Sequence, residues 1–374
     1  MKNRLIIDKT RQDKTRQDKT RQDKTRQDKQ PYCRNSSLEL LRIVAMLIIL
    51  LHHFRIDGGF DLGKNFSFIN ELWLRFWGST GNLGHLGDEI FVFISGYFLV
   101  KSQRVKWQKV FNLWLRVLFY SITFFVIFTF CGIDRPSTEK IVRSFFPILT
   151  RHWWFISCYF ILYVLHPFLN TVLVELNKKS YRTFIILMFV LWSLVLLTNY
   201  DVEFDKIIDF ICLYSIGGYI RLWNDKAGKK YILWGIAFAI AGFLVLFMLE
   251  ITGTGFISVG DKKIYLVQYI HGMMGIFDVF AALFMLMGFS SLNVPYSKLI
   301  NTIASATLGV YLIHGNIFMG KFLWNNIFHN ASFQDSPYLI PYSICVVILV
   351  YVVCTLIELL RSKIFRILSR GYLS

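Results

Sequence analysis

The sequence predicts an all-α protein that crosses a membrane as a polytopic bundle of about ten helices. Hydrophobic residues make up 55% of its 374 residues, whereas charged residues make up only 17%. Aromatic residues alone account for 17%, more than the core of a soluble domain of this size requires. Because hydrocarbon does not tolerate unpaired backbone polar groups, the long apolar runs must span it as helices.

Apolar segments follow one another along almost the whole chain after residue 34. The first begins at Ser36, where Ser36 and Glu39 match the Ser-x-x-Glu pattern of a helix capping box. Each segment is long enough for a helical span, and together they predict one transmembrane domain over residues 35–374. The predicted spans are 38–54, 83–100, 110–131, 152–173, 183–199, 206–222, 231–250, 268–289, 300–320 and 338–360.

Residues 1–34 are predicted to form a separate basic extension. The sequence DKTRQ occurs four times, at 8–12, 13–17, 18–22 and 23–27. The segment has almost no apolar residues, and its five-residue period fits neither a heptad nor a solenoid unit, so we expect disorder. It is either a basic arm that contacts anionic lipid headgroups or a dispensable extension.

Basic residues predict which side of the membrane each terminus occupies. If the N-terminus is cytoplasmic, the cytoplasmic loops are basic, and one outer loop, with Asp201, Glu203 and Asp205, is acidic. This is the positive-inside asymmetry, and an even number of spans returns the C-terminus to the cytoplasm. The basic residues on that side are Lys101, Arg104, Lys106, Lys109, Lys178, Lys179, Arg182, Arg221, Lys226, Lys229, Lys230, Arg361, Lys363, Arg366 and Arg370.

The net charge of +17 therefore does not indicate nucleic-acid binding. Residues 1–34 hold 12 Lys and Arg against five Asp, and much of the remaining excess is explained by topology. We expect membrane lipids and no nucleic acid as partners. The six cysteines form no Cys-x-x-Cys motif and mostly fall inside predicted spans, so we expect neither a disulfide framework nor a metal site.

The first span carries ionisable residues of a kind that a bilayer normally excludes. Glu39 and Arg42 lie near one end of it, and His52 and His53 lie near the other. Such residues usually face a site lined by protein. Eleven residues, or about three turns, separate Arg42 from His53, so both project from one face about 16 Å apart. His52 lies about 100° away from that face.

His53 is the best catalytic candidate, either as a general base or as a transient acyl carrier. The structural alternative is a histidine that is simply hydrogen-bonded within the bundle. The second span runs back across the membrane, which places Asp88 and Glu89 at the depth of His53. A carboxylate that holds one ring nitrogen leaves the other free to act as a base, so we predict that Glu89 orients His53. The alternative is that Glu89 is an interfacial residue exposed to water.

Arg42 and Arg116 are the candidate anion-binding residues. Both lie a turn or two inside the predicted cytoplasmic face. The guanidinium group suits phosphate, so a phosphorylated cytoplasmic ligand would fit. The alternative is that these side chains extend to lipid headgroups for structural reasons alone. Glu39 either caps the helix or pairs with Arg42 three residues later.

Four short motifs follow one another along the predicted spans. They are Glu39-x-x-Arg42-x-x-Ala45 followed by His53; Glu89-Ile-Phe-Val-Phe-Ile-Ser95-Gly96-Tyr97; His152-Trp153-Trp154-Phe155 with Tyr159, Tyr163 and Pro167; and Ser305-x-Thr307-x-Gly309-x-Tyr311-x-x-His314. With these motifs, spread over residues 35–360, the chain resembles the membrane acyltransferase-3 family, in particular its bacterial polysaccharide O-acetyltransferases.

The resemblance implies transfer of an acetyl group from cytoplasmic acetyl-CoA to a carbohydrate hydroxyl at the outer face. It gives His53 the position of the catalytic histidine and Arg42 that of the essential arginine. Relatives often carry Arg-x-x-Arg in the third span, thought to contact the phosphates of CoA. Here Arg116 fits the second position, Leu113 occupies the first, and Lys109 or Lys106 is expected to supply the missing cation.

We therefore expect a multi-pass O-acetyltransferase of the bacterial inner membrane that acts on a surface polysaccharide or its lipid-linked precursor. The alternatives are a flippase for lipid-linked glycans and a polysaccharide polymerase. Trp154 is first interpreted as part of the aromatic belt at the membrane interface, and stacking on a sugar is its alternative. The residues that we assign to the acceptor, all from the motifs, are His314, Tyr311, Trp154 and Ser95.

Overall fold

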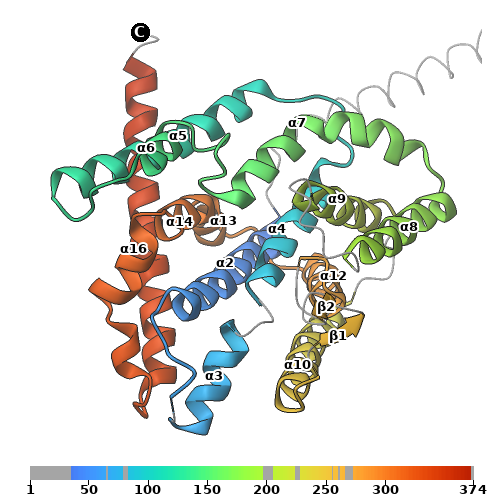
Figure 1. Cartoon of the computed structure of the whole chain (residues 1–374). Coiled ribbons are helices and arrows are strands. Elements are labelled where there is room, and N and C mark those ends of the chain that lie inside the picture. The colour runs from blue at the N-terminus through green and yellow to red at the C-terminus, as the bar shows by residue number, and fades with distance from the viewer. Residues whose placement is uncertain are drawn as a thin grey trace, which may run out of the picture.

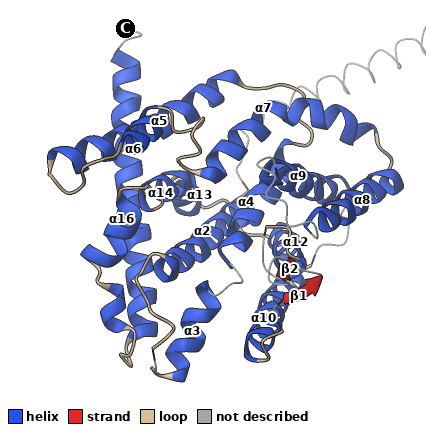
Figure 2. Ribbon diagram, viewed as in Figure 1, coloured by secondary structure: helices blue, strands red, loops and turns tan. Residues whose placement is uncertain are grey.

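A computed structural model describes residues 35–64, 66–78, 83–196, 205–223, 228–254, 256–259, 262–265 and 273–371. The described part is a bundle of helices with one short hairpin (Figures 1 and 2). The predicted extension at residues 1–34 lies outside the described residues. Two short strands form the hairpin and pair antiparallel, with Phe256 opposite Tyr265.

Helices occupy at least part of every predicted span. The elements are α2 (Ser36–Ile56), α3 (Phe68–Gly78), α4 (Leu83–Leu99), α5 (Trp107–Phe130), α6 (Thr138–Phe145), α7 (Trp154–Glu175), α8 (Lys178–Leu196), α9 (Asp205–Trp223), α10 (Lys230–Ile251), β1 (Phe256–Val259), β2 (Lys262–Tyr265), α12 (Ile276–Ser290), α13 (Lys298–Ser305), α14 (Thr307–His314), α15 (Met319–Lys321), the π-helix η1 (Phe322–Ile327), the 3-10 helix η2 (Asn330–Phe333) and α16 (Leu339–Gly371).

Several of these helices can cross a membrane. Among the described residues, five are long and apolar enough: α2, α5, α7, α10 and the first 30 residues of α16. The pair Lys298–His314 and Met319–Ile327 also passes this test but is bent by 94°, as a broken span or a re-entrant loop would be. The protein is thus a helical membrane protein. The full count of ten spans and the side of each terminus remain predictions.

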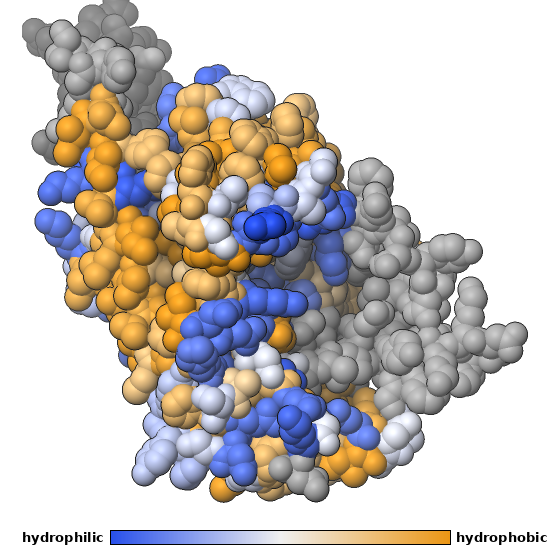
Figure 3. Space-filling model, turned by 60° about the vertical axis from the view of Figure 1, so that its left-hand side comes forward, coloured by the Kyte–Doolittle hydropathy of each residue, from blue (hydrophilic) through white to orange (hydrophobic). Residues whose placement is uncertain are grey.

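The outer surface of the bundle is suited to lipid. Large apolar side chains are exposed on α10 and α16, among them Leu233 and Leu356, at 70% and 60% exposure. Figure 3 shows hydrophobic side chains over much of the surface in view. Contiguous apolar surface on this scale is rare on soluble monomers, whereas lipid tails are as apolar as leucine.

Helix α4 lies at the centre and packs against α2, α9 and α12. Small residues let the backbones approach closely. A Cβ atom at Gly96 would lie 2.1 Å from the carbonyl oxygen of Tyr214 on α9. Towards α2, a Cβ atom at Gly84 would lie 2.5 Å from the ring of His52, and one at Gly87 would lie 2.7 Å from the carbonyl oxygen of Ala45. Helices α2 and α4 are therefore antiparallel neighbours.

Candidate active site

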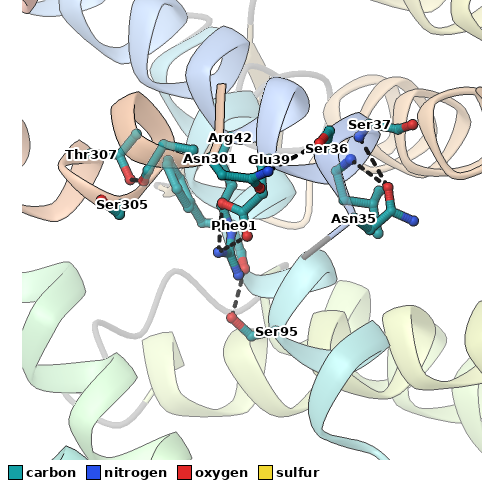
Figure 4. Close-up of polar contacts among 12 residues, drawn as sticks. Asn35, Ser36, Ser37, Glu39, Arg42, Phe91, Ser95, Asn301, Ser305 and Thr307 are labelled. Atoms are coloured by element: carbon teal, nitrogen blue, oxygen red, sulfur yellow. Dashed lines mark hydrogen bonds and ion pairs between the residues drawn. The ribbon is translucent and has the colours of Figure 1, made fainter. Parts of the chain in front are cut away.

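The first turn of α2 differs in detail from the predicted capping box. The side chain of Asn35, not Ser36, caps the helix by accepting from the backbone N–H groups of Ser37 and Leu38. The carboxylate of Glu39 is left for Arg42, whose Nη1 lies 3.1 and 3.2 Å from its two oxygens (Figure 4). Of the two roles predicted for Glu39, the structure shows the ion pair with Arg42 and not the helix cap.

Arg42 lines a cavity of about 490 Å³, a size typical of small-molecule sites. Helices α2, α4, α5, α7, α13, α14 and α16 all contribute to its wall. Ser95, Ser305 and Thr307 surround Arg42 in Figure 4. The complete lining is Arg42, Met46, Ile49, Asp88, Phe91, Ser95, Arg116, Phe155, Ile156, Tyr159, Ala304, Ser305, Thr307, Leu308, Tyr311, Glu358, Leu359, Ser362 and Arg366.

The face of α2 that carries Arg42 forms one wall of this cavity. Arg42, Met46 and Ile49 all line it, and they are spaced by four and three residues as one helix face requires. His53 continues the same face one turn beyond Ile49 but is not among the lining residues. The predicted face of α2 thus contains both Arg42 and His53. The cavity borders this face from Arg42 to Ile49 and ends before His53.

His53 has a carboxylate partner, but it is Asp57 and not Glu89. The Nδ1 atom of His53 lies 2.8 Å from Oδ2 of Asp57, four residues later at the end of α2. Glu89 is fully buried and accepts from the backbone N–H of Met274 at 3.0 Å. The predicted orienting role therefore falls to Asp57, because α2 continues one turn past His53 and brings Asp57 onto the same face.

His314 lies directly against His53. The two ring centroids are 5.1 Å apart, and the rings are arranged edge to face. The Nδ1 atom of His314 lies 2.7 Å from the carbonyl oxygen of Val310, which indicates that Nδ1 carries the proton. Its ring is also 5.9 Å from that of Tyr311, which lines the cavity. Tyr311 and His314 therefore connect the cavity with His53.

His52 has a structural environment. Its side chain is buried, and Nδ1 lies 2.9 Å from the carbonyl oxygen of Trp77 at the end of α3. The ring also packs against Gly84 of α4, where a Cβ atom would clash with it. His52 thus joins α2 to α3 and α4 on a side of the helix that does not face the cavity, as its angular offset predicts.

The other predicted site residues divide into two groups. Ser95 lines the cavity, and its hydroxyl donates to the carbonyl oxygen of Phe91 at 2.8 Å. Trp154 does not line it and packs edge to face against His85, with 6.0 Å between the ring centroids. Lys109 is exposed and lies outside the lining. Acceptor binding by Trp154 and donor binding by Lys109 therefore rest on the sequence alone.

Arg116 belongs to a buried charge cluster that the sequence analysis missed. Its Nε atom lies 3.5 Å from Oε1 of Glu358, whose side chain is only 2% exposed. Glu358 also accepts from Arg361 at 2.6 and 2.8 Å and from the Tyr120 hydroxyl at 2.7 Å. Gly309 leaves room for this carboxylate, since a Cβ atom there would lie 2.5 Å from Cγ of Glu358.

His152 lies just before α7 and links α6 to the segment between α14 and α15. Its Nδ1 is 3.2 Å from the carbonyl oxygen of Arg143, and its Nε2 is 3.3 Å from the side-chain amide of Asn316. Burial is the main reason that its pKa is lowered to about 4, so the ring is neutral at pH 7. His152 thus fixes α6 against the segment that follows His314.

Three functional candidates therefore emerge only from the structure: Asp57, Glu358 and Arg366. Ionisable residues within apolar spans are a general signal of function, and Glu358 and Arg361 carry that signal in the last span. Asp57 stands four residues after His53, which is a spacing that places two side chains together on a helix. Among the described residues, no group of three or more His, Cys, Asp or Glu could hold a metal ion.

The arrangement combines three features of an acyl-transfer site. Guanidinium groups from α2, α5 and α16 line one cavity, which suits a phosphorylated donor. Ser95, Ser305 and Tyr311 bring hydroxyl groups to the same cavity. An imidazole paired with a carboxylate lies one turn beyond it, as general-base chemistry on a hydroxyl requires.

Comparison with known proteins agrees with this chemistry. The family model described as an acyltransferase domain, Acyl_transf_3, matches residues 35–359. Searches of curated proteins and of solved structures gave no match. The matched region includes all four motifs and ends directly after Glu358. The chain therefore belongs to the acyltransferase-3 family and is a membrane acyltransferase.

Proposed function

We propose that the protein is an O-acetyltransferase of the bacterial inner membrane. It moves acetyl from cytoplasmic acetyl-CoA to a hydroxyl of a cell-surface polysaccharide or its lipid-linked precursor. The observation that carries this proposal is the arginine-lined cavity whose α2 wall leads to the His53–Asp57 pair. Arg42 and Arg116 then hold donor phosphates, and Ser95, Tyr311 and His314 contact the acceptor.

In this mechanism, His53 is the general base. Its Nδ1–H donates to Asp57, which leaves the lone pair of Nε2 for the acceptor hydroxyl. As Nε2 takes the hydroxyl proton, the oxygen attacks the thioester carbonyl and the carbon–sulfur bond breaks. The imidazolium then returns the proton to the departing thiolate. Asp57 stabilises the imidazolium between these steps.

Asp57→Asn should lower the turnover number about 10²-fold and leave the KM for acetyl-CoA nearly unchanged. The amide keeps the volume but removes the charge that stabilises protonated His53. Acetyl transfer by purified protein measures this effect. Asp61→Asn is the matched control, because the exposed Asp61 side chain lies in the next loop, where it accepts from the N–H of Gly63 and lies 3.7 Å from Lys64. Full activity of Asp57→Asn together with loss in Glu89→Gln would restore the predicted role of Glu89.

Surface glycan from wild-type and deletion strains tests the proposed function itself. Mass spectrometry should show that the deletion strain exports its glycan in normal amount but without acetyl groups, and that the wild-type gene restores them. Missing polymer would instead indicate a carrier, and altered chain length would indicate a polymerase. Missing polymer, or altered chain length with unchanged acetylation, would contradict acetyl transfer.

A further inference from the structure

The cavity has an acidic residue on α4 to which the proposed function gives no role. Asp88 lines the cavity and is 8% exposed. Phe91 and Ser95 follow it in the lining at spacings of three and four residues, so the three side chains lie on one face of α4. The motif of this segment begins only at the next residue, Glu89. The place of Asp88 in the lining therefore follows from the fold and not from that motif.

The antiparallel packing of α4 against α2 brings Asp88 near His53. A Cβ atom at Gly87, the residue before Asp88, would lie 2.6 Å from Cγ1 of Ile49 on α2. Ile49 precedes His53 by one turn, which is about 6 Å along the helix axis. Asp88 and His53 also interact electrostatically. Asp88 therefore lies at the end of the cavity that adjoins His53.

His85 lies next to Asp88, one turn earlier on α4. Its Nδ1 atom is 3.6 Å from Oδ2 of Asp88, and its ring packs against that of Trp154. Lys206 on α9 also interacts electrostatically with the carboxylate. A carboxylate has about four positions at which it can accept a hydrogen bond, so the contact with His85 does not exhaust them. Asp88 can thus accept hydrogen bonds from a ligand in the cavity.

Charge makes Asp88 suitable for one substrate and unsuitable for the other. Arg42 and Arg116 bring guanidinium groups to the cavity, and these attract the phosphates of the donor. An ionised carboxylate repels phosphate and only accepts hydrogen bonds. A carbohydrate supplies the donors that such a group needs, because hydroxyl groups surround its ring. Asp88 therefore suits the acceptor.

We propose that Asp88 accepts a hydrogen bond from a second hydroxyl of the sugar unit that is acetylated. This inference rests on the proposed function. His53 takes the proton of one hydroxyl, and Asp88, near the turn of α2 that precedes His53, holds another hydroxyl of the same unit. The acceptor is thus a sugar with a further free hydroxyl beside the reacting one. Asp88 determines which of them is acetylated, because it fixes the orientation of the ring.

Kinetics with the natural glycan test the inference. Full-length protein in nanodiscs receives acetyl-CoA and unacetylated glycan isolated from the deletion strain. Asp88→Asn should raise the KM for the glycan about tenfold, the effect of one weakened hydrogen bond to a charged group. The turnover number and the KM for acetyl-CoA should stay nearly unchanged, because the lost contact is made to the bound acceptor alone. Asp88→Ala should also place acetyl on more than one hydroxyl of the unit, which NMR of the product detects.

Asp134→Asn is the matched control. Asp134 pairs with Lys140 in the loop after α5 and does not line the cavity, so its substitution should change neither KM value. An unchanged KM for the glycan together with an unchanged acetylation site would overturn the role of Asp88, as would an equal rise in both KM values. Failure of the wild-type protein to acetylate the glycan would instead refute the proposed function, so the two failures are distinguishable.

Discussion

His53→Ala should abolish acetyl transfer, with a loss of at least about 10²–10⁴-fold, whereas His52→Ala should keep most of it. His53 is the imidazole that pairs with Asp57 and contacts His314, and it is the base in the proposed mechanism. His52 instead bonds the carbonyl oxygen of Trp77 and faces α3 and α4. Transfer of labelled acetyl from acetyl-CoA to the glycan by membranes of each strain measures the difference.

The neighbouring histidine is a stringent control for this result. Both substitutions remove one imidazole from the same helix turn, so a general loss of stability would affect both. Protein abundance in the membrane fraction separates folding from catalysis. Equal loss of activity in both variants at equal abundance would remove the reason for assigning catalysis to the face that carries Arg42.

Glu358→Ala should destabilise the protein by about 3–5 kcal/mol. The carboxylate is buried and binds Arg361 and Tyr120 at 2.6–2.8 Å, with Arg116 at 3.5 Å. Its removal leaves two guanidinium groups without their anion inside a membrane-spanning bundle. Denaturant titration in detergent micelles measures the free energy of unfolding.

A surface pair provides the comparison for Glu358. Glu139 and Arg143 form an ion pair at 2.9 Å on α6, where both side chains are exposed. Glu139→Ala should change the free energy of unfolding little, because water and salt screen such pairs. An unfolding midpoint of Glu358→Ala equal to that of the wild type would show that the cluster does not hold α16 against α5.

Much of the fold could be predicted because a long apolar segment in a bilayer must pair its backbone polar groups, and a helix does so within the segment. The predicted spans all contain helix, and the face shared by Arg42, Met46 and Ile49 follows from helical periodicity alone. The hairpin of β1 and β2 was not predicted, since it lies between spans where no apolar run marks it. The break at 94° after His314 also has no signal in hydropathy.

The site was predicted less completely, for two physical reasons. Asp57 was missed because the predicted span ended at residue 54, whereas α2 extends through Ile56 and turns Asp57 towards His53. Glu358 was missed because two of its partners, Tyr120 and Arg116, are distant in sequence, and Arg366 was missed because only the fold brings it to the cavity. The contact of Glu358 with Arg116 joins residues 242 positions apart, and only the packing of α16 against the bundle brings them together.

Transfer across a sealed membrane tests most directly whether the cavity and His53 form one path. Purified protein is reconstituted into proteoliposomes with labelled acetyl-CoA on one side and an oligosaccharide acceptor only on the other. We expect the wild-type protein to place label on acceptor hydroxyl groups and His53→Ala to place none. Label that reaches the acceptor only when both substrates share one side would contradict a path from the arginine-lined cavity to His53.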